Sequence, residues 1–162
     1  MLVISTAHLL RIEHHARDSY PHECCGVLVG YTAGERLVTA VHHTANRATN
    51  GTRDSYRIGP REILRIMRGL GDGLQIVGFY HSHPDFPPVP SAQDAEKAWP
   101  SYSYLIVSVR NGDPLAVRAW RWSHAHRVFE PEPVQVATRT PARVRLPLGL
   151  SPRAGAGSPA GA

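Results

Sequence analysis

The residues best suited to chemistry form a short pattern, His-Ser-His-Pro at positions 81–84, with Asp94 eleven residues after the second histidine. Side chains alternate along a β-strand, so His81 and His83 should point to the same side and bind one metal ion together. Pro84 should end that strand, because proline has no backbone N–H to donate to a neighbouring strand. The chain can then turn and bring Asp94 back as a third ligand. Three protein ligands leave the fourth position of a tetrahedral zinc ion open for water, as a catalytic site requires.

Each part of this pattern also has a purely structural interpretation. His124 and His126 have the same spacing, but no aspartate follows them within reach, so we interpret them as surface or packing residues near a hairpin. Ser91 and Asp94 match the Ser-x-x-acid pattern of a helix start, where an acid also complements the helix dipole. The structural and chemical roles are compatible, because residues three apart share a helix face and a helix start holds them rigidly.

A hydrolase also needs a group that takes a proton from the attacking water and gives one to the leaving group. Glu23 is the candidate, since it precedes the apolar strand predicted at residues 26–30. Without the histidine pattern, Glu23 would be interpreted as an ordinary solvated loop residue. Cys24 and Cys25 are the only cysteines, and they would point to opposite sides of an extended segment. We therefore expect both to be buried rather than to share one metal ion, and adjacent cysteines exclude a disulfide framework.

Together, these residues resemble the JAMM motif of the MPN+ metalloproteases, in the small stand-alone bacterial type. The resemblance covers about residues 1–130 in motif and in the order of elements. It implies that His81, His83 and Asp94 bind Zn²⁺. Glu23 would be the general acid/base that acts on the zinc-activated water, and Ser91 would donate a hydrogen bond to the oxyanion of the tetrahedral intermediate.

The resemblance also implies a protein substrate, the extended C-terminal tail of a ubiquitin-like or sulfur-carrier protein. Such a tail can lie along a sheet edge, and the bond cleaved would be an isopeptide bond to lysine or a peptide bond to one amino acid. The alternative is a non-catalytic MPN-type scaffold that binds a ubiquitin-like partner, although every residue of the motif is present. Zinc deaminases need His-x-Glu and Pro-Cys-x-x-Cys, which are missing, and a barrel amidohydrolase needs about 250 residues.

The elements that must hold these residues follow from the apolar pattern. A helix over about residues 6–18 should begin at Ser5 or Thr6. A second helix should begin at Gly59-Pro60 and be ended by Gly71 and Gly73, and its apolar stripe should consist of Ile63, Ile66, Met67 and Leu70. A third, short helix is expected at 91–98, and hairpin turns are expected at Ala33-Gly34 and Asn111-Gly112. Strands are expected at residues 2–4, 26–30, 36–44, 55–58, 74–80, 104–109, 115–122 and 127–129. This order predicts an α/β or α+β fold with a mixed sheet flanked by helices, and the resemblance implies the MPN fold, which is related to the cytidine-deaminase architecture.

The length of 162 residues favours one domain, which we place at residues 1–133. Residues 134–162 are rich in Ala, Pro, Gly and Arg and contain no acid, so we expect a flexible tail. That segment holds four of the arginines behind the net charge of +5, which leaves about +1 for the domain and disfavours nucleic-acid binding. The N-terminal segment shows neither a basic leader nor a long apolar run, so we expect a cytoplasmic protein without membrane contact.

Overall fold

The computed structural model describes residues 1–49 and 51–140, and most of the predicted tail therefore lies outside the described residues. The strands are β1 (Leu2–Ser5), β2 (Cys25–Ala33), β3 (Glu35–Thr44), β4 (Gln75–Pro84), β5 (Ser103–Arg110), β6 (Asp113–Ser123), β7 (Val128–Glu132) and β8 (Val134–Ala137). The helices are α1 (Thr6–Ser19), α2 (Pro60–Arg68) and α3 (Ala92–Lys97).

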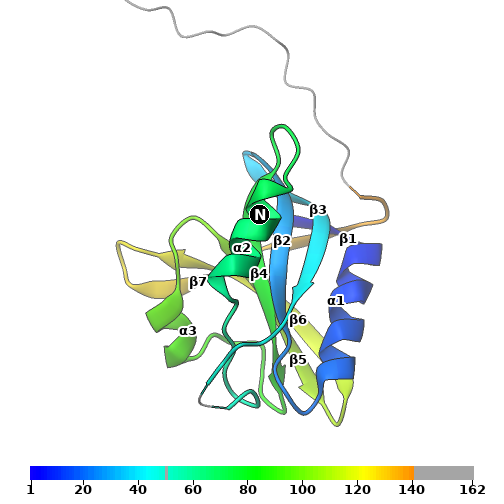
Figure 1. Ribbon diagram of the computed structural model, residues 1–162, viewed down its shortest axis with the longest axis vertical. Coiled ribbons are helices and arrows are strands. Elements are labelled where there is room, and N and C mark those ends of the chain that lie inside the picture. Colours follow the sequence, from blue (N-terminus) through cyan, green and yellow to red (C-terminus); the bar gives the residue numbers. More distant parts are fainter. Residues whose placement is uncertain (50, 141–162) are drawn as a thin grey trace, which may run out of the picture.

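All these strands form one mixed sheet in the order β7-β6-β5-β4-β2-β3-β1-β8 (Figure 1). β4 lies at the centre, antiparallel to β2 and parallel to β5. Parallel neighbours need a long crossover, and the segment that carries α3 supplies it. The predicted α/β (α+β) class with a mixed sheet flanked by helices is confirmed.

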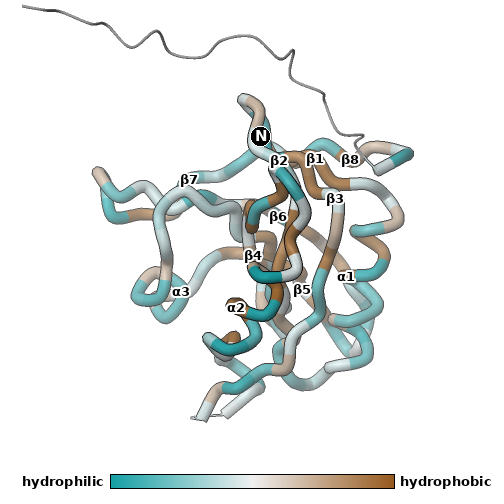
Figure 2. Tube along the Cα trace, turned by 45° about the horizontal axis from the view of Figure 1, so that its top comes forward, coloured by the Kyte–Doolittle hydropathy of each residue, from teal (hydrophilic) through white to brown (hydrophobic). Residues whose placement is uncertain are grey.

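The core lies on both faces of the sheet, and Figure 2 shows hydrophobic residues concentrated along the central strands. On one face, α1 packs Ile12 and Ala16 against Leu28 and other strand residues. On the other face, α2 packs Ile66 against Phe79. Adjacent residues of a strand point to opposite faces of the sheet. Because both faces are covered at β2 and β4, these strands carry apolar residues at consecutive positions. Burial of one such isoleucine stabilises the fold by about 2 kcal/mol.

Several predicted elements are confirmed with small shifts of their ends. Ser5 caps α1, since its hydroxyl accepts a hydrogen bond from the His8 N–H at 3.2 Å. Pro84 ends β4. The β2–β3 and β5–β6 hairpins turn where expected, at Gly34 and at Asn111-Gly112, all of which have positive φ.

The strand predicted at residues 55–58 is wrong, because this segment has no regular structure. The side chain of Asn46 makes hydrogen bonds to this segment that a neighbouring strand would otherwise make. It donates to the Ser55 carbonyl at 2.9 Å and accepts from the Arg57 N–H at 3.1 Å. Tyr56 packs on His81 instead of joining a sheet.

Two details of α2 and the domain boundary are also corrected. Met67 is 53% exposed rather than part of the core, because the helix turns it away from the buried Ile66. α2 ends at Arg68, before the predicted glycines, because the Gly69 N–H donates to carbonyls of the last turn and caps the helix there.

Val134–Ala137 pair in parallel with β1, so the sheet extends four residues past the boundary placed at residue 133.

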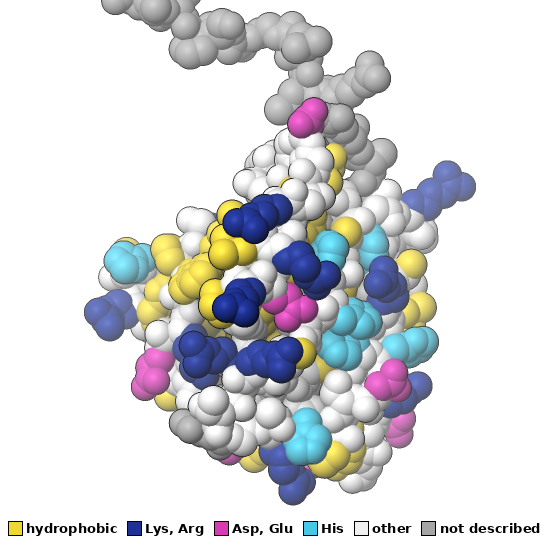
Figure 3. Space-filling model, viewed as in Figure 1, with side chains coloured by type: hydrophobic (Ala, Val, Ile, Leu, Met, Phe, Trp, Pro, Cys, Tyr) yellow, Lys and Arg dark blue, Asp and Glu magenta, His cyan; other side chains and the backbone are white. Residues whose placement is uncertain are grey.

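No helix within the described residues is long and apolar enough to cross a membrane. On the face shown in Figure 3, basic side chains gather over α2 and histidines gather closer to α1.

Candidate metal centre

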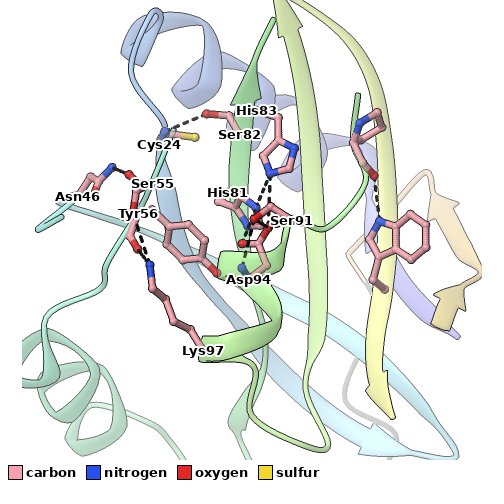
Figure 4. Close-up of polar contacts among 12 residues, drawn as sticks. Cys24, Asn46, Ser55, Tyr56, His81, Ser82, His83, Ser91, Asp94 and Lys97 are labelled. Atoms are coloured by element: carbon pink, nitrogen blue, oxygen red, sulfur yellow. Dashed lines mark hydrogen bonds and ion pairs between the residues drawn. The ribbon is translucent and has the colours of Figure 1, made fainter. Parts of the chain in front are cut away.

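Two strand residues and one helix residue converge in a buried cluster (Figure 4). His81 and His83 lie at the end of β4, and their Nε2 atoms are 3.0 Å apart. Asp94 lies in the first turn of α3, with Oδ1 3.3 Å from His81 Nε2 and Oδ2 3.7 Å from His83 Nε2. The spacing predicted from the sequence is therefore realised, because β4 presents both rings on one side and the turn after Pro84 returns α3 to them.

The chemistry of this donor set fits a zinc ion. His83 Nδ1 lies 2.9 Å from the Pro87 carbonyl, which can only accept, so Nδ1 carries the proton. In the neutral imidazole, Nε2 is then unprotonated and faces the cluster, which is the tautomer that a metal ligand needs. The three ligand atoms lie within 4.8 Å of one another, and two imidazoles with one carboxylate are a common set for a catalytic zinc.

Tyr56, which the sequence did not single out, holds the other imidazole in place. Its ring stacks on His81 with centroids 4.3 Å apart and planes 21° apart. His81 Nδ1 is buried and has no hydrogen-bond partner among the described residues, so a hydrogen bond at that atom does not orient the ring. Stacking on Tyr56 and contact with Asp94 therefore fix its position.

Ser91 and Asp94 form a complete capping box at the start of α3. The Ser91 hydroxyl accepts from the Asp94 N–H at 3.2 Å, and the Ser91 N–H donates to Asp94 Oδ2 at 2.7 Å. The same hydroxyl donates to Asp94 Oδ2 at 2.7 Å, so the cap also orients the carboxylate toward the histidines. The predicted capping role of this pair is therefore confirmed.

Burial and polar contacts shift the pKa values of the cluster residues in opposite directions. Burial alone would raise the pKa of Asp94, but the adjacent imidazoles of His81 and His83 outweigh it and hold the pKa well below its ordinary value. Burial lowers the pKa of His81. Burial would also lower the pKa of His83, but its contacts with Asp94 and with the Pro87 carbonyl raise it. An ionised carboxylate beside a neutral imidazole, His81, suits metal binding.

Glu23 is buried beside this cluster, with 7% of its surface exposed. Burial, the largest cause, raises the pKa of its carboxyl to about 8, with His83 opposing the shift and Asp94 adding to it. Its backbone is held by the loop before α2, through the Thr52 carbonyl and the Asn46 side chain. Glu23 therefore holds a proton near neutral pH in the same environment as the two histidines.

Ser82 links the segment of Glu23 to the strand of the histidines. Its hydroxyl accepts from the Cys24 N–H at 2.9 Å, and its N–H donates to the Cys24 carbonyl at 3.1 Å. Cys24 and Cys25 are free and buried, as predicted. Burial raises the pKa of Cys24 to about 12 and that of Cys25 to about 11, so both remain thiols that pack rather than bind a metal.

His124 and His126, the pair with the same spacing, lie elsewhere on the surface. Both are exposed, and His126 Nδ1 lies 3.0 Å from Glu130 Oε1. This arrangement agrees with their interpretation as surface residues.

A pocket of about 460 Å³ adjoins the cluster through Tyr56, which belongs to both. Its walls combine aromatic and aliphatic side chains with two cations, and they include Ser55, Tyr56, Arg57, Ile58, Ile63, Phe79, Lys97, Trp99 and Tyr104. The pocket depends on contacts between segments far apart in the sequence, which is why no local pattern indicated it.

Residues 5–123 match the family described as prokaryotic homologs of the JAB domain. The desampylase of Haloferax volcanii is 46% identical over 100 residues, which cover 58% of this chain and 70% of that protein. The CysO-cysteine peptidase of Mycobacterium tuberculosis is 32% identical over 111 residues, which cover 66% of this chain and 73% of that protein.

Among solved structures, the protein DSY2949 from Desulfitobacterium hafniense aligns with a TM-score of 0.75 at 28% identity. The alignment covers 86% of this chain and 94% of that one. The chain therefore belongs to the family of prokaryotic homologs of the JAB domain, which confirms the predicted relationship to the small prokaryotic JAMM/MPN+ proteins.

Proposed function

We propose that this protein is a zinc-dependent peptidase or isopeptidase that cleaves after the C-terminal tail of a ubiquitin-like or sulfur-carrier protein in the cytoplasm. The observation that carries the proposal is the buried cluster of His81, His83 and Asp94 with Glu23 beside it. The names of the relatives, desampylase and CysO-cysteine peptidase, support a ubiquitin-like or sulfur-carrier substrate.

His81, His83 and Asp94 would hold the zinc ion, which would supply Lewis-acid polarisation of the scissile carbonyl and of the attacking water. Glu23 would take a proton from that water and deliver it to the leaving nitrogen. A carboxyl with a pKa of about 8 accepts and releases a proton at neutral pH more readily than an ordinary glutamate, which matches both halves of this task.

Ser91 would stabilise the negative charge that develops on the carbonyl oxygen. Its hydroxyl donates to Asp94 in the structure, and a hydroxyl can rotate to donate to a nearby oxyanion instead. Because the backbone N–H groups of the capping box also hold Ser91, the hydroxyl can change partner without loss of the helix start. Pre-positioned donors of this kind lower the barrier of acyl transfer.

Two histidine pairs with the same spacing provide a matched test of the metal site. The variant His81→Ala/His83→Ala should lose zinc, whereas His124→Ala/His126→Ala should retain about one zinc per chain, measured by mass spectrometry of metals. Wild-type protein that contains no metal after gentle purification, and takes up none when zinc is added, would falsify the catalytic proposal.

The activity test uses ubiquitin-like proteins with short C-terminal extensions, with intact mass as the readout. Wild-type protein should release the extension, and a chelator should stop the release. If zinc is bound and the ubiquitin-like protein binds but is not cleaved, the non-catalytic scaffold becomes the better assignment.

A further inference from the structure

The outward face of α2 carries a row of arginines around exposed apolar side chains (Figure 3). Arg61, Leu64, Arg65 and Arg68 follow the i, i+3, i+4, i+7 spacing that places side chains on one side of a helix. All three arginines are exposed. Leu64 and Met67 are 49% and 53% exposed.

Two arginines from the preceding loop extend this row. The Arg47 N–H donates to the Arg57 carbonyl at 2.8 Å, and the Arg47 side chain lies against Gly59, the residue that caps α2. Both arginines are exposed. We call the resulting surface the arginine face, and it consists of Arg47, Arg57, Arg61, Leu64, Arg65, Met67 and Arg68.

The charges of this surface are poorly balanced within the surface itself. Glu62 is the only acidic residue in positions 55–71, and it lies 3.4 Å from Arg65. Like charges one helical turn apart, as at Arg61 and Arg65, destabilise a helix. Arg65 and Arg68 lie in the last turn of α2, where they complement the helix dipole, but Arg47, Arg57 and Arg61 lie outside that turn. The surface thus carries more positive charge than α2 uses, and this charge suits an acidic partner. Exposed apolar side chains among arginines are also typical of protein interfaces.

The arginine face borders the pocket that adjoins the metal centre through Tyr56. Arg57 belongs to both, and Ile63 of α2 lines the pocket from its other side. The pocket in turn meets the cluster where Tyr56 stacks on His81. A protein tail that enters this pocket would leave the globular body of its protein next to α2.

We propose that the arginine face docks an acidic surface with an apolar centre on the globular body of the ubiquitin-like substrate, while the substrate's tail reaches the metal centre. This inference rests on the proposed function. Nucleic acid is a poorer fit, because Leu64 and Met67 lie among the arginines and none of the seven residues is aromatic and able to stack on a base.

The test compares two probes that share a tail. One is a hexapeptide that ends in Gly-Gly-aminomethylcoumarin, and the other is a ubiquitin-like protein of net negative charge with the same tail and fluorophore. In the variant Arg61→Glu/Arg65→Glu/Arg68→Glu, kcat/KM should fall about 30-fold or more for the protein probe, because charge reversal replaces attraction by repulsion. It should change less than about 2-fold for the peptide, which has no body to dock. Added salt should raise the wild-type KM for the protein probe only.

The matched control is Arg110→Glu/Arg118→Glu/Arg127→Glu, which changes the net charge equally at exposed positions outside α2. This control should cleave both probes like wild type. Equal losses in the two triple variants would mean that only overall charge matters and would overturn the proposal. If the first variant does not fold, as judged by its thermal melt, the corresponding Arg→Gln variant replaces it, with a smaller loss expected.

Binding of the labelled protein probe, measured by fluorescence anisotropy, separates docking from catalysis. If wild type cleaves neither probe, the proposed function fails, but weaker probe binding by the α2 variant alone would still support docking. Equal binding by wild type and variant would refute docking. A labelled 20-base-pair DNA duplex is the third probe, and tight binding that the α2 variant loses, with protein cleavage unchanged, would assign the surface to nucleic acid instead.

Discussion

At the scale of single residues, a change at Glu23 tests the proposed proton transfer separately from metal binding. The change Glu23→Gln keeps the shape of the side chain but removes its ability to take a proton. We expect the variant to retain zinc, because the three ligands are untouched, and to lose cleavage by about 10²- to 10⁴-fold. Metal content and turnover of the extended ubiquitin-like protein are the measurements. Glu96→Gln, an exposed change on α3, should behave like wild type. Comparable turnover in Glu23→Gln would show that another group carries the proton.

Tyr56 stacks on His81, one of the proposed zinc ligands, so its variants should alter zinc affinity. Tyr56→Phe keeps the ring that stacks on His81, whereas Tyr56→Leu removes it. Groups that orient ligands typically contribute 10- to 100-fold in affinity, so we expect about a 10-fold loss for Leu and less than about 2-fold for Phe. Competition with a zinc-chelating dye measures both. An equal loss in both variants would assign the effect to the hydroxyl group.

At the scale of elements, β8 shows how a short edge strand completes the sheet. It pairs with β1 over four residues, and the Thr6 hydroxyl donates to the Ala137 carbonyl at 3.3 Å. A chain that ends at Pro133 should therefore be less stable than one that ends at Ala137, by on the order of 2 kcal/mol for the lost backbone hydrogen bonds. Urea unfolding of the two chains, with a chain ending at Thr140 as control, measures the difference. Identical midpoints would mean that β8 contributes nothing.

The elements that the sequence predicted well are those whose own residues determine them. α1 has a capping serine and an apolar stripe, and β4 is apolar on both sides, so local pattern was sufficient. The sequence of residues 55–58 is typical of a strand, but the side chain of Asn46 forms hydrogen bonds with the backbone of this segment. The apolar pattern of a sequence does not indicate such a contact. The predicted burial of Met67 failed for a related reason, because the apolar stripe of α2 is wider than the part of the core that the helix covers.

The candidate site also contains residues that the sequence predicted and residues that it did not. His81, His83 and Asp94 lie close in sequence, and Ser91 with Asp94 forms a local cap, so spacing alone brought them together. Ser82 was missed because its contact with Cys24 joins residues 58 apart. Tyr56 was missed because it lies in a loop whose path depends on tertiary contacts. Residues that support a site are thus harder to predict than the residues that form it.

At the scale of the whole molecule, groups on opposite faces of the sheet make stability depend on pH in opposite directions. On the α1 face, His15 stacks on His43, and its Nδ1 forms a hydrogen bond with the Tyr80 hydroxyl at 2.8 Å. Burial, followed by the charge of His43, lowers the pKa of His15 from 6.5 to about 4. Between these values the unfolded chain binds the proton and the folded chain does not, so stability falls as pH drops from 6.5 toward 4.

Glu23 works the other way, because burial raises its pKa from 4.5 to about 8. Between these values the folded protein keeps a proton that the unfolded chain has released, so the free energy of unfolding decreases as pH rises through this range. Between pH 4.5 and 6.5 the two effects oppose each other, and above pH 6.5 only the loss at Glu23 remains. Of these two groups, Glu23 should therefore make the metal-free protein less stable as pH rises from 6.5 to 8. The side chain proposed to carry the proton in the reaction is thus a cost to the fold near neutral pH.

The two arms of this pH profile can be removed separately in the metal-free protein. Glu23→Gln has nothing to ionise, so it should flatten the alkaline arm and should be more stable than wild type at pH 8, by an amount on the order of a few kcal/mol. His15→Gln leaves the effect of Glu23 unopposed, so stability should fall from pH 5 to 6 in this variant, without a change in the slope between pH 7 and 8. Urea unfolding at pH 5, 6, 7 and 8 tests both. If the Glu23→Gln variant keeps the wild-type alkaline slope, Glu23 is already ionised in the folded protein. Glu23 would then have no proton to hold beside His83 and would act in the reaction only as a base.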